Sequence, residues 1–230
     1  MIGREAGKSY AYIVGVYLGD GCVTRYNNGI AFRLNTIDED FALAVKNALA
    51  DLTEVPVRIW KETVSKSSKP NYALCCADEQ LCAMLTTHCD GKSTLPMMFD
   101  WSDDMKKQLI IGLMDSEGFV AKNTNNHTDR GFYMGFKSCD VWVPDFIRLL
   151  QSVGLKIGKI QTEKPYKPHY KAPTRFSIKM QSWVDSGLRF NIKRKQERID
   201  TWAAAVPYTQ RRVFPKKLTS ETSTPEARKG

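Results

Sequence analysis

Apolar residues in "QLIIGLMDSEGFV", residues 108–120, follow a helical pattern that turns acidic at its end and stops at a glycine. Ser102 is a candidate N-cap, acidic residues follow it, and Gly118 is expected to close the C-terminus, which predicts a helix of about 15 residues. Gly112 and Ser116 form a pair of small residues on this helix. Glycine inside a helix costs about 1 kcal/mol relative to alanine. We therefore expect a second helix to make close contact at this pair.

A similar segment, "AYIVGVYLGDGCV", occupies residues 11–23. Both segments have the spacing Gly-x-x-x-x-acid-Gly, and Gly112 follows Gly15 by 97 positions. The first segment also has a pair of small residues four positions apart. The chain is therefore predicted to contain a tandem repeat. If the two helices meet at their small residues, Asp20 and Glu117 come together at their ends.

Alternation of apolar and polar residues predicts strands with one apolar face and one polar, mostly basic face. Apolar residues occupy positions 30, 32, 34, 176 and 178, and polar residues occupy positions 33, 35, 175, 177 and 179. Each repeat is interpreted as a motif helix, two strands, a helix, two strands and a closing helix. Such a sheet buries one face under its helices and leaves the other for a partner. The matching strand-to-helix segments are 29–52 with 131–155, and 71–85 with 174–188.

The pattern predicts an α+β protein with two pseudo-symmetric αββαββα repeats. We expect the N-terminal repeat to span residues 1–100 and the C-terminal repeat residues 101–206. Residues 207–230 are rich in Ser, Thr, Pro and charge. This composition predicts a basic, mobile tail.

The amino-acid composition indicates which class of partner the protein binds. The hydrophobic fraction of 42% is that of a globular protein, and no apolar run reaches the roughly 18 residues of a membrane span. The N-terminus has no apolar segment of the kind found in secretion signals, so we expect a cytoplasmic or organellar-matrix protein that is not secreted. The net charge of +9 favours a polyanionic partner such as nucleic acid, although solubility alone also explains a positive charge.

The six cysteines form no C-x-x-C pair, so free thiols are expected in a reducing compartment. Cys75, Cys82 and Cys89 recur every seven residues, next to His88. This spacing fits no familiar zinc site. We therefore favour small buried residues over a zinc site.

The segments "IVGVYLGDG" and "IIGLMDSEG" resemble the two motifs of a single-chain LAGLIDADG homing endonuclease. The resemblance extends over roughly residues 10–202 and includes the closing segment "FNIKRKQERI". The first motif departs from the family pattern at Leu18, where the family has an earlier acid that is not catalytic. The resemblance implies motif helices packed at the centre and two antiparallel sheets that form a saddle over DNA.

The resemblance also implies which residues carry the chemistry. Asp20 and Glu117 correspond to the catalytic acids that bind divalent metal, with Gly19 and Ser116 beside them in the metal site. Asp115 is expected to pack or cap. Two carboxylates with Mg²⁺ suit phosphodiester hydrolysis, because the metal activates water and offsets charge on the leaving oxygen. Mn²⁺ is expected to substitute, and Ca²⁺ to bind without efficient cleavage.

Basic and polar residues are expected around these acids. Lys92 and Lys193 would stabilise the pentavalent phosphate or polarise the attacking water. Asn35 or Thr36, and Lys137, are expected to position that water. The polar sheet faces would contact bases and phosphates in the major groove. The candidate DNA-binding residues are Arg25, Asn28, Arg33, Arg58, Lys61, Lys122, Asn123, Arg130, Lys159, Gln161, Arg175 and Lys179.

The function implied by the resemblance is site-specific cleavage of double-stranded DNA at a long asymmetric target, by a monomer that leaves short 3′ overhangs. A non-cleaving nucleic-acid binder, such as an intron RNA maturase or a transcriptional regulator, stays open as the alternative. Such regulators tend to lose the motif acids, which this chain keeps, but maturases retain them. A carboxylate-pair glycosidase would need an aromatic sugar cleft. An intein would need splicing blocks around the motifs.

Overall fold

The computed structural model describes residues 4–26, 29–62, 70–122, 132–165 and 171–205, and these form two halves with the same order of elements. The first half contains α1 (Arg4–Leu18), β1 (Cys22–Tyr26), β2 (Gly29–Thr36), α2 (Glu39–Ala50), β3 (Arg58–Glu62), β4 (Asn71–Cys76) and α3 (Glu79–His88). Two short 3-10 helices, η1 (Asp90–Lys92) and η2 (Pro96–Asp100), lead to the second half. The second half contains α4 (Asp103–Ser116), β5 (Gly118–Lys122), β6 (Phe132–Ser138), α5 (Val143–Ser152), β7 (Ile157–Thr162), β8 (Thr174–Ile178), α6 (Met180–Asp185) and α7 (Lys193–Ala205).

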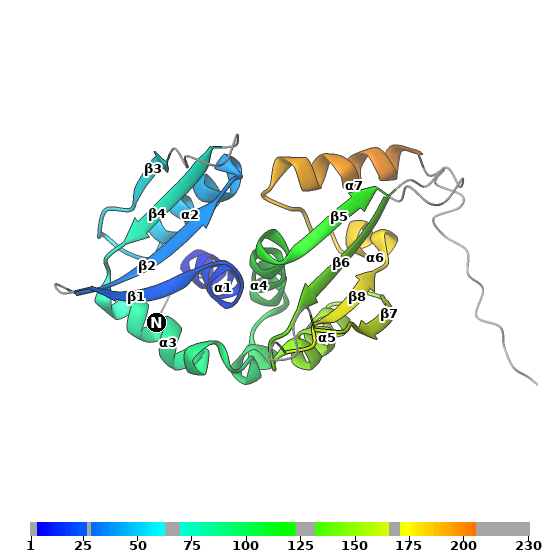
Figure 1. The fold of residues 1–230 in the computed structure, drawn as a ribbon, viewed down its shortest axis with the longest axis horizontal. Helices are drawn as coiled ribbons and strands as arrows, with labels where there is room; N and C mark the ends of the chain where they lie inside the picture. The colour runs from blue at the N-terminus through cyan, green and yellow to red at the C-terminus, as the bar shows by residue number, and fades with distance from the viewer. Residues whose placement is uncertain (1–3, 27–28, 63–69, 123–131, 166–170, 206–230) are drawn as a thin grey trace, which may run out of the picture.

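Each half has a four-stranded antiparallel sheet, with strand orders β1-β2-β4-β3 and β5-β6-β8-β7. The two orders are equivalent, so the predicted α+β fold with repeated halves is confirmed. Figure 1 shows α1 and α4 side by side at the centre, with one sheet on either side. Helix α7 follows the repeated elements of the second half, packs against β5 and β6, and lies beside their upper ends in Figure 1.

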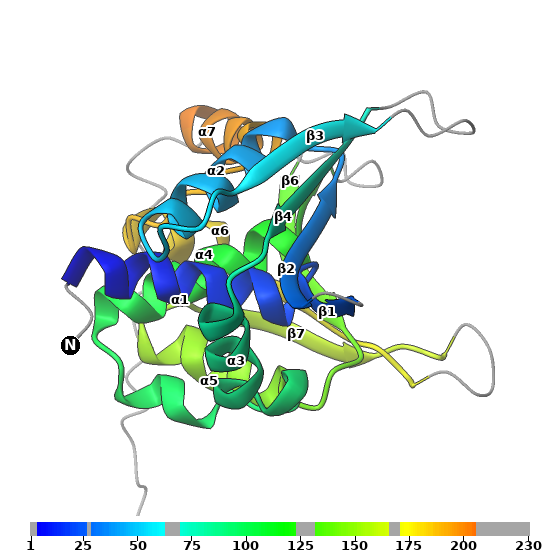
Figure 2. The ribbon, with the colours of Figure 1, turned by 90° about the vertical axis from the view of Figure 1, so that its left-hand side faces the viewer.

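One face of each sheet forms the core, as the alternation predicts. In the first half Phe32, Leu34 and Leu74 are buried between the strands and helices α2 and α3. In the second half Phe136 and Phe176 stack with ring centroids 5.5 Å apart and continue into an aromatic cluster with α5. Figure 2 shows the strands toward one side of the molecule and helices α2, α5 and α6 toward the other. The polar faces are therefore turned to the same side.

The two motif helices cross at their small residues. A Cβ atom added at Gly15 would lie 2.3 Å from the carbonyl oxygen of Leu109 on α4. A Cβ atom added at Gly112 would lie 2.3 Å from the carbonyl oxygen of Tyr12 on α1. These distances leave no space for a methyl group, so the predicted close contact between the two helices is confirmed.

The ends of α4 are defined by two different residues. The Ser102 side chain caps the N-terminus by accepting a hydrogen bond from the Met105 N–H at 3.4 Å. Helix α4 ends at Ser116 with Glu117 as its C-cap, so Gly118 directly follows the helix end, as expected, but it does so as the first residue of β5 and without a positive φ. Glycine is required there because a Cβ atom would lie 2.5 Å from the Met114 carbonyl oxygen.

Some predicted features lie outside the described residues: Asn28, Asn123, Arg130 and the tail 207–230. Within the described part of the chain, no helix has the length and apolarity that crossing a membrane requires. Cys82 and Cys89 are buried in the hydrophobic core, while Cys75 is partly exposed on β4.

Candidate active site at the junction of the two halves

Asp20 and Glu117 lie at the adjoining C-terminal ends of α1 and α4. A Cβ atom added at Gly19 would lie 2.4 Å from Ser116 Cβ and 3.4 Å from Glu117 Cγ, so the two helix ends are in contact. Burial raises the pKa of Glu117, and the neighbouring charge of Asp20 raises it further. Asp20 stays accessible to solvent, yet the surrounding groups remove enough water to raise its pKa as well. The two carboxylates therefore form one site in which like charges repel.

Two lysines reach the ends of the motif helices. Lys92 Nζ donates to the Gly19 carbonyl oxygen at 2.9 Å. Lys195 Nζ donates to the carbonyl oxygens of Met114 and Asp115 at 2.9 and 2.6 Å. The C-terminus of a helix carries partial negative charge, so it favours a cation at this position. Burial lowers the pKa of Lys92, and it lowers the pKa of Lys195 to about 8.

In the second half, the candidate site lysine is Lys195 rather than Lys193, which corrects the expectation from the sequence. The Lys193 side chain is 80% exposed, with its Nζ 3.9 Å from Glu197 on the surface of α7. Lys195 is only 4% exposed and interacts electrostatically with Asp20. A signal for this was present in the sequence, because Lys195 lies on the helix face defined by the buried residues Ile192 and Ile199.

A second carboxylate accompanies each motif acid, and the sequence analysis did not identify either one. Asp38 follows β2 and raises the pKa of Asp20, whereas Asp140 follows β6 and raises the pKa of Glu117. The backbone N–H of Asp38 donates to Thr36 Oγ1 at 3.1 Å, and the Asp140 N–H donates to Ser138 Oγ in the same way at 3.2 Å. The repeated pattern hydroxyl-x-Asp after the second strand of each half was the available signal.

Lys195 owes its position to contacts that cross between the halves. Asp115, expected to pack or cap, accepts hydrogen bonds from Tyr12 Oη on α1 at 3.1 Å, and from Asn191 N and Nδ2 at 3.2 and 3.0 Å. Arg194 donates from Nε and Nη2 to both carboxylate oxygens of Asp38, at 2.6 and 2.7 Å. Burial raises the pKa of Asp115 to about 6. These contacts hold the start of α7 against the first half.

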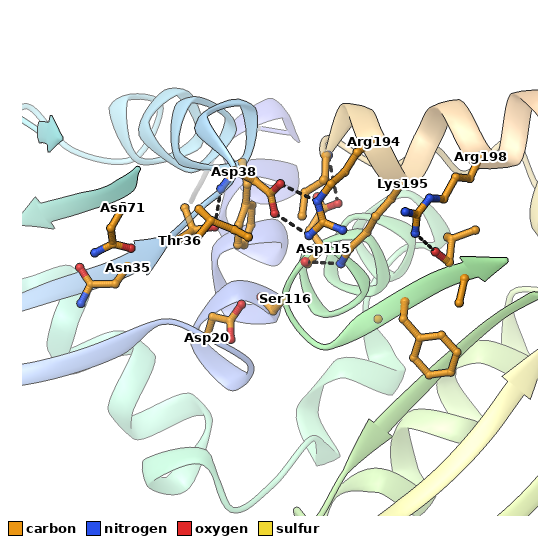
Figure 3. Close-up of a pocket in the computed structure, with 17 residues that line it drawn as sticks. Asp20, Asn35, Thr36, Asp38, Asn71, Asp115, Ser116, Arg194, Lys195 and Arg198 are labelled. Carbon is orange, nitrogen blue, oxygen red and sulfur yellow. Dashed lines mark hydrogen bonds and ion pairs between the residues drawn. The ribbon is translucent and has the colours of Figure 1, made fainter. Parts of the chain in front are cut away.

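A pocket opens beside Asp20, between the end of β2 and the start of α7 (Figure 3). Asn35 and Thr36 line this pocket, as does Ser116. Lys137 occupies the equivalent strand position in the second half, but its Nζ lies 2.5 Å from Glu163 Oε2. The pocket therefore combines an acid and strand-end groups of the first half with Lys195 of the second.

Strand register separates the candidate DNA-binding residues into two groups. On the first sheet Arg33 and Arg58 both pair with Cys75 and share the polar face. On the second sheet Gln161 pairs with Arg175, again on the polar face. Lys159, in the irregular part of β7, and Lys179, after β8, are exposed.

Three candidates instead lie on the sheet faces that carry the helices, which corrects their assignment to the DNA-facing side. Arg25 pairs with Ile30 and Lys122 pairs with Phe132, and both partners pack against the hydrophobic core. Lys61 pairs with Tyr72, whose hydroxyl donates to Glu39 at the start of α2. Successive residues of a strand point to opposite faces, so a shift of one position reverses the assignment.

Comparison with solved structures places this arrangement among known proteins. Mesophilic variants of the homing endonuclease I-DmoI align with a TM-score of 0.54 and 15% identity, over 80% of this chain and 94% of theirs. The homing endonuclease I-WcaI, bound to its DNA recognition sequence, aligns with a TM-score of 0.54 and 10% identity, over 85% of this chain and 87% of its own. Full-length DUF199/WhiA from Thermatoga maritima aligns with a TM-score of 0.53 and 12% identity, over 92% of this chain and 63% of its own.

No family model and no curated protein sequence matches the chain. The similarity is therefore one of structure, at identities that establish the fold. It covers most of the chain, from 80% for I-DmoI to 92% for WhiA. The chain has the α+β LAGLIDADG fold of these homing endonucleases and of WhiA.

Proposed function

We propose that this protein is a site-specific endonuclease that hydrolyses double-stranded DNA with a divalent metal ion. The observation that carries the proposal is the placement of Asp20 and Glu117 at the contact between α1 and α4, with Lys92 and Lys195 beside them. The polar sheet faces turn to one side of the molecule (Figure 2) and provide a surface for DNA. The products are expected to carry short 3′ overhangs.

The residues of the site fit Mg²⁺. Burial raises the pKa of both acids. A neighbouring carboxylate raises each further, Asp38 for Asp20 and Asp20 for Glu117, so a cation between the two acids would relieve an unfavourable concentration of negative charge. The described residues contain no cluster of three or more His, Cys, Asp or Glu that could hold a metal alone. Mg²⁺ is commonly held by one or two carboxylates together with water and substrate phosphates. Backbone groups at Gly19 and Ser116 would complete the protein ligands.

The same site accounts for the expected metal preferences. When bound, the ion supplies an activated water and offsets charge on the leaving 3′ oxygen. Mn²⁺ is expected to support cleavage, and Ca²⁺ to support binding with little cleavage. Structures of I-DmoI contain its DNA with Ca or with Mn, which supports this choice of ions.

The protein's own groups position the reacting atoms. Lys92 and Lys195 bring two ammonium groups to the ends of the motif helices, where they would stabilise the charge that develops on the pentavalent phosphate. Asn35 and Thr36 line the pocket beside Asp20, where their hydrogen-bonding groups orient the attacking water. Lys137 would serve the second strand cut after leaving its ion pair with Glu163.

Target recognition follows from the repeat. The two polar faces carry different residues, so the target is asymmetric. Both halves of a twofold site are present in one polypeptide, so one protein molecule suffices for each duplex. The cationic side chains of the polar faces would contact phosphates and base edges. These residues are Arg33, Arg58, Lys159, Arg175 and Lys179.

The test is cleavage of supercoiled plasmid carrying a target selected by digesting a randomised library with Mg²⁺. Asp20→Asn and Glu117→Gln should each abolish at least one strand cut, because an amide supplies no charge to hold Mg²⁺. Asp103→Asn is the matched control, since it removes a carboxylate from the opposite end of α4, where Asp103 is 75% exposed. This control should cut both strands.

Gel-shift measurements in Ca²⁺ complete the test. Both acid variants should bind the target at least as tightly as wild type, because removal of a carboxylate reduces repulsion of the phosphates. Full double-strand cleavage by the double variant would overturn the assignment of the acids. Specific binding without cleavage by wild type in Mg²⁺ and Mn²⁺ would favour the non-cleaving maturase or regulator.

A further inference from the structure

The polar face of the second sheet holds one arginine against two aromatic rings. Arg175 Cζ on β8 lies 5.0 Å from the ring centroid of Phe119 on β5 and 5.8 Å from that of Tyr133 on β6. Arg175 Nη2 also donates to the Tyr133 hydroxyl at 3.2 Å. Three neighbouring strands therefore fix the plane of a single guanidinium group.

A glycine makes room for this arrangement. A Cβ atom added at Gly135 would lie 2.8 Å from Phe119 Cζ, so the ring occupies the space that a side chain at this position would fill. The rings of Phe119 and Tyr133 then meet edge to face, with centroids 5.7 Å apart and an interplanar angle of 74°. This geometry is favourable for aromatic pairs and stiffens the support beneath the arginine.

Glu163, just beyond β7, completes the cluster. One carboxylate oxygen lies 3.5 Å from Arg175 Nη1, and the other lies 2.5 Å from Lys137 Nζ. The three charged side chains are 33–46% exposed, so the cluster is accessible to a partner. The Glu163 carboxylate neutralises part of the positive charge, which weakens the cluster as a phosphate site. The guanidinium group of Arg175 keeps its planar arrangement of N–H donors.

We propose that Arg175 reads a guanine in the half-site bound by the second sheet, and that Glu163 is the positioning residue that presents its guanidinium. The inference rests on the proposed function only in requiring that the polar faces bind DNA. Arginine donates two parallel hydrogen bonds to guanine O6 and N7, and this pair is unique to guanine in the major groove. A guanidinium held by rings and a carboxylate loses less conformational freedom on binding than a free side chain.

The experiment selects bound duplexes from a randomised library in Ca²⁺, so that the readout is binding rather than cleavage. Wild type is expected to select guanine at one position, at least about tenfold over the other bases. Arg175→Lys keeps the charge but loses the two parallel donors of the guanidinium group. Guanine selection at this position should therefore fall about tenfold, while base selection at the other positions stays unchanged. Glu163→Gln should lower guanine selection and raise affinity for unrelated DNA, because a negative charge is lost.

Arg148→Lys is the matched control. Arg148 on α5 also lies over an aromatic ring, with Cζ 5.4 Å from the Phe99 centroid, and it forms an ion pair with Asp145. It lies on the helix that covers the opposite face of the sheet, so its substitution should leave the base profile unchanged.

An unchanged profile in Arg175→Lys, or equal loss of affinity for all sequences, would overturn the inference. A Glu163→Gln variant that keeps full guanine selection would remove the positioning role. A wild type that selects sequences in Ca²⁺ but cuts none in Mg²⁺ contradicts the endonuclease proposal alone. A wild type that binds no duplex contradicts both.

Discussion

The crossing of α1 and α4 brings the two acids together, so its tolerance for a single added methyl group is a direct test of the structure. In Gly15→Ala, the new Cβ atom would lie 2.3 Å from the Leu109 carbonyl oxygen and 2.8 Å from the Leu113 backbone nitrogen. A carbon–oxygen contact needs about 3.3 Å, so the helices must separate by about 1 Å. The obstructing atoms are backbone, and no change of side-chain rotamer can relieve the contact.

The expected change in the unfolding free energy of Gly15→Ala is the sum of two opposing contributions. Overpacking a core costs typically about 1–3 kcal/mol, and a rigid backbone contact places this site at the upper end. Alanine gains about 1 kcal/mol over glycine in helix propensity. The net loss of unfolding free energy is therefore about 2 kcal/mol, which corresponds to a fall in Tm of about 4–8 °C for a chain of this size.

Gly7→Ala provides the control in the same helix. A Cβ atom added at Gly7 would lie 3.5 Å from Met105 Sδ, an ordinary contact with a flexible side chain. Only the propensity gain remains, so this variant should unfold about 2–4 °C above wild type. Thermal unfolding followed by far-ultraviolet circular dichroism measures both variants. Equal shifts in the same direction would refute the close helix crossing, as would wild-type stability in Gly15→Ala.

Two further predictions concern the lysines. Lys195→Met should lower the single-turnover cleavage rate about 100-fold with DNA binding retained, because Lys195 Nζ reaches the C-terminal end of α4, next to Glu117. Lys193→Met should change the rate less than about threefold, because Lys193 is exposed on the surface of α7. The opposite ranking would restore Lys193 to the site. Burial lowers the pKa of Lys195 to about 8, so its charge is present below that pH and lost above it. Cleavage by wild type should therefore decline as pH rises through 8, and Lys195→Arg, which stays charged, should show no such decline; the same decline in both proteins would assign the titration to another group.

Much of the architecture was predictable because it depends on local periodicity and on distances along the chain. The alternation over 30–35 and 175–179 identified the buried sheet faces, and the spacing of Gly15 and Gly112 identified a repeat and a helix contact. Such patterns extend over few residues, and the polarity of each residue indicates directly whether that residue is buried or exposed. The positions of Asp20 and Glu117 at helix ends follow directly from the same spacing.

Tertiary structure decided which polar groups meet. "FNIKRKQERI" contains several cations. Only the docking of α7 through Asp115 and Asp38 shows that Lys195 reaches the C-terminal end of α4 while Lys193 is exposed to solvent. Strand register placed Arg25 and Lys61 on the sheet face that carries the helices, away from the polar face. Polar side chains carry little periodic signal, because either face of an exposed strand accepts them.

The sequence by itself therefore determined the two repeats, the buried faces, the helix crossing and the pair of acids, since burial of apolar surface imposes a regular pattern on the chain. Only the tertiary structure decided the lysine at the site, the carboxylates Asp38 and Asp140, and the aromatic support of Arg175. Each of these depends on side chains from elements far apart in sequence. A local pattern can single out one such residue, but only register and packing decide which residues meet.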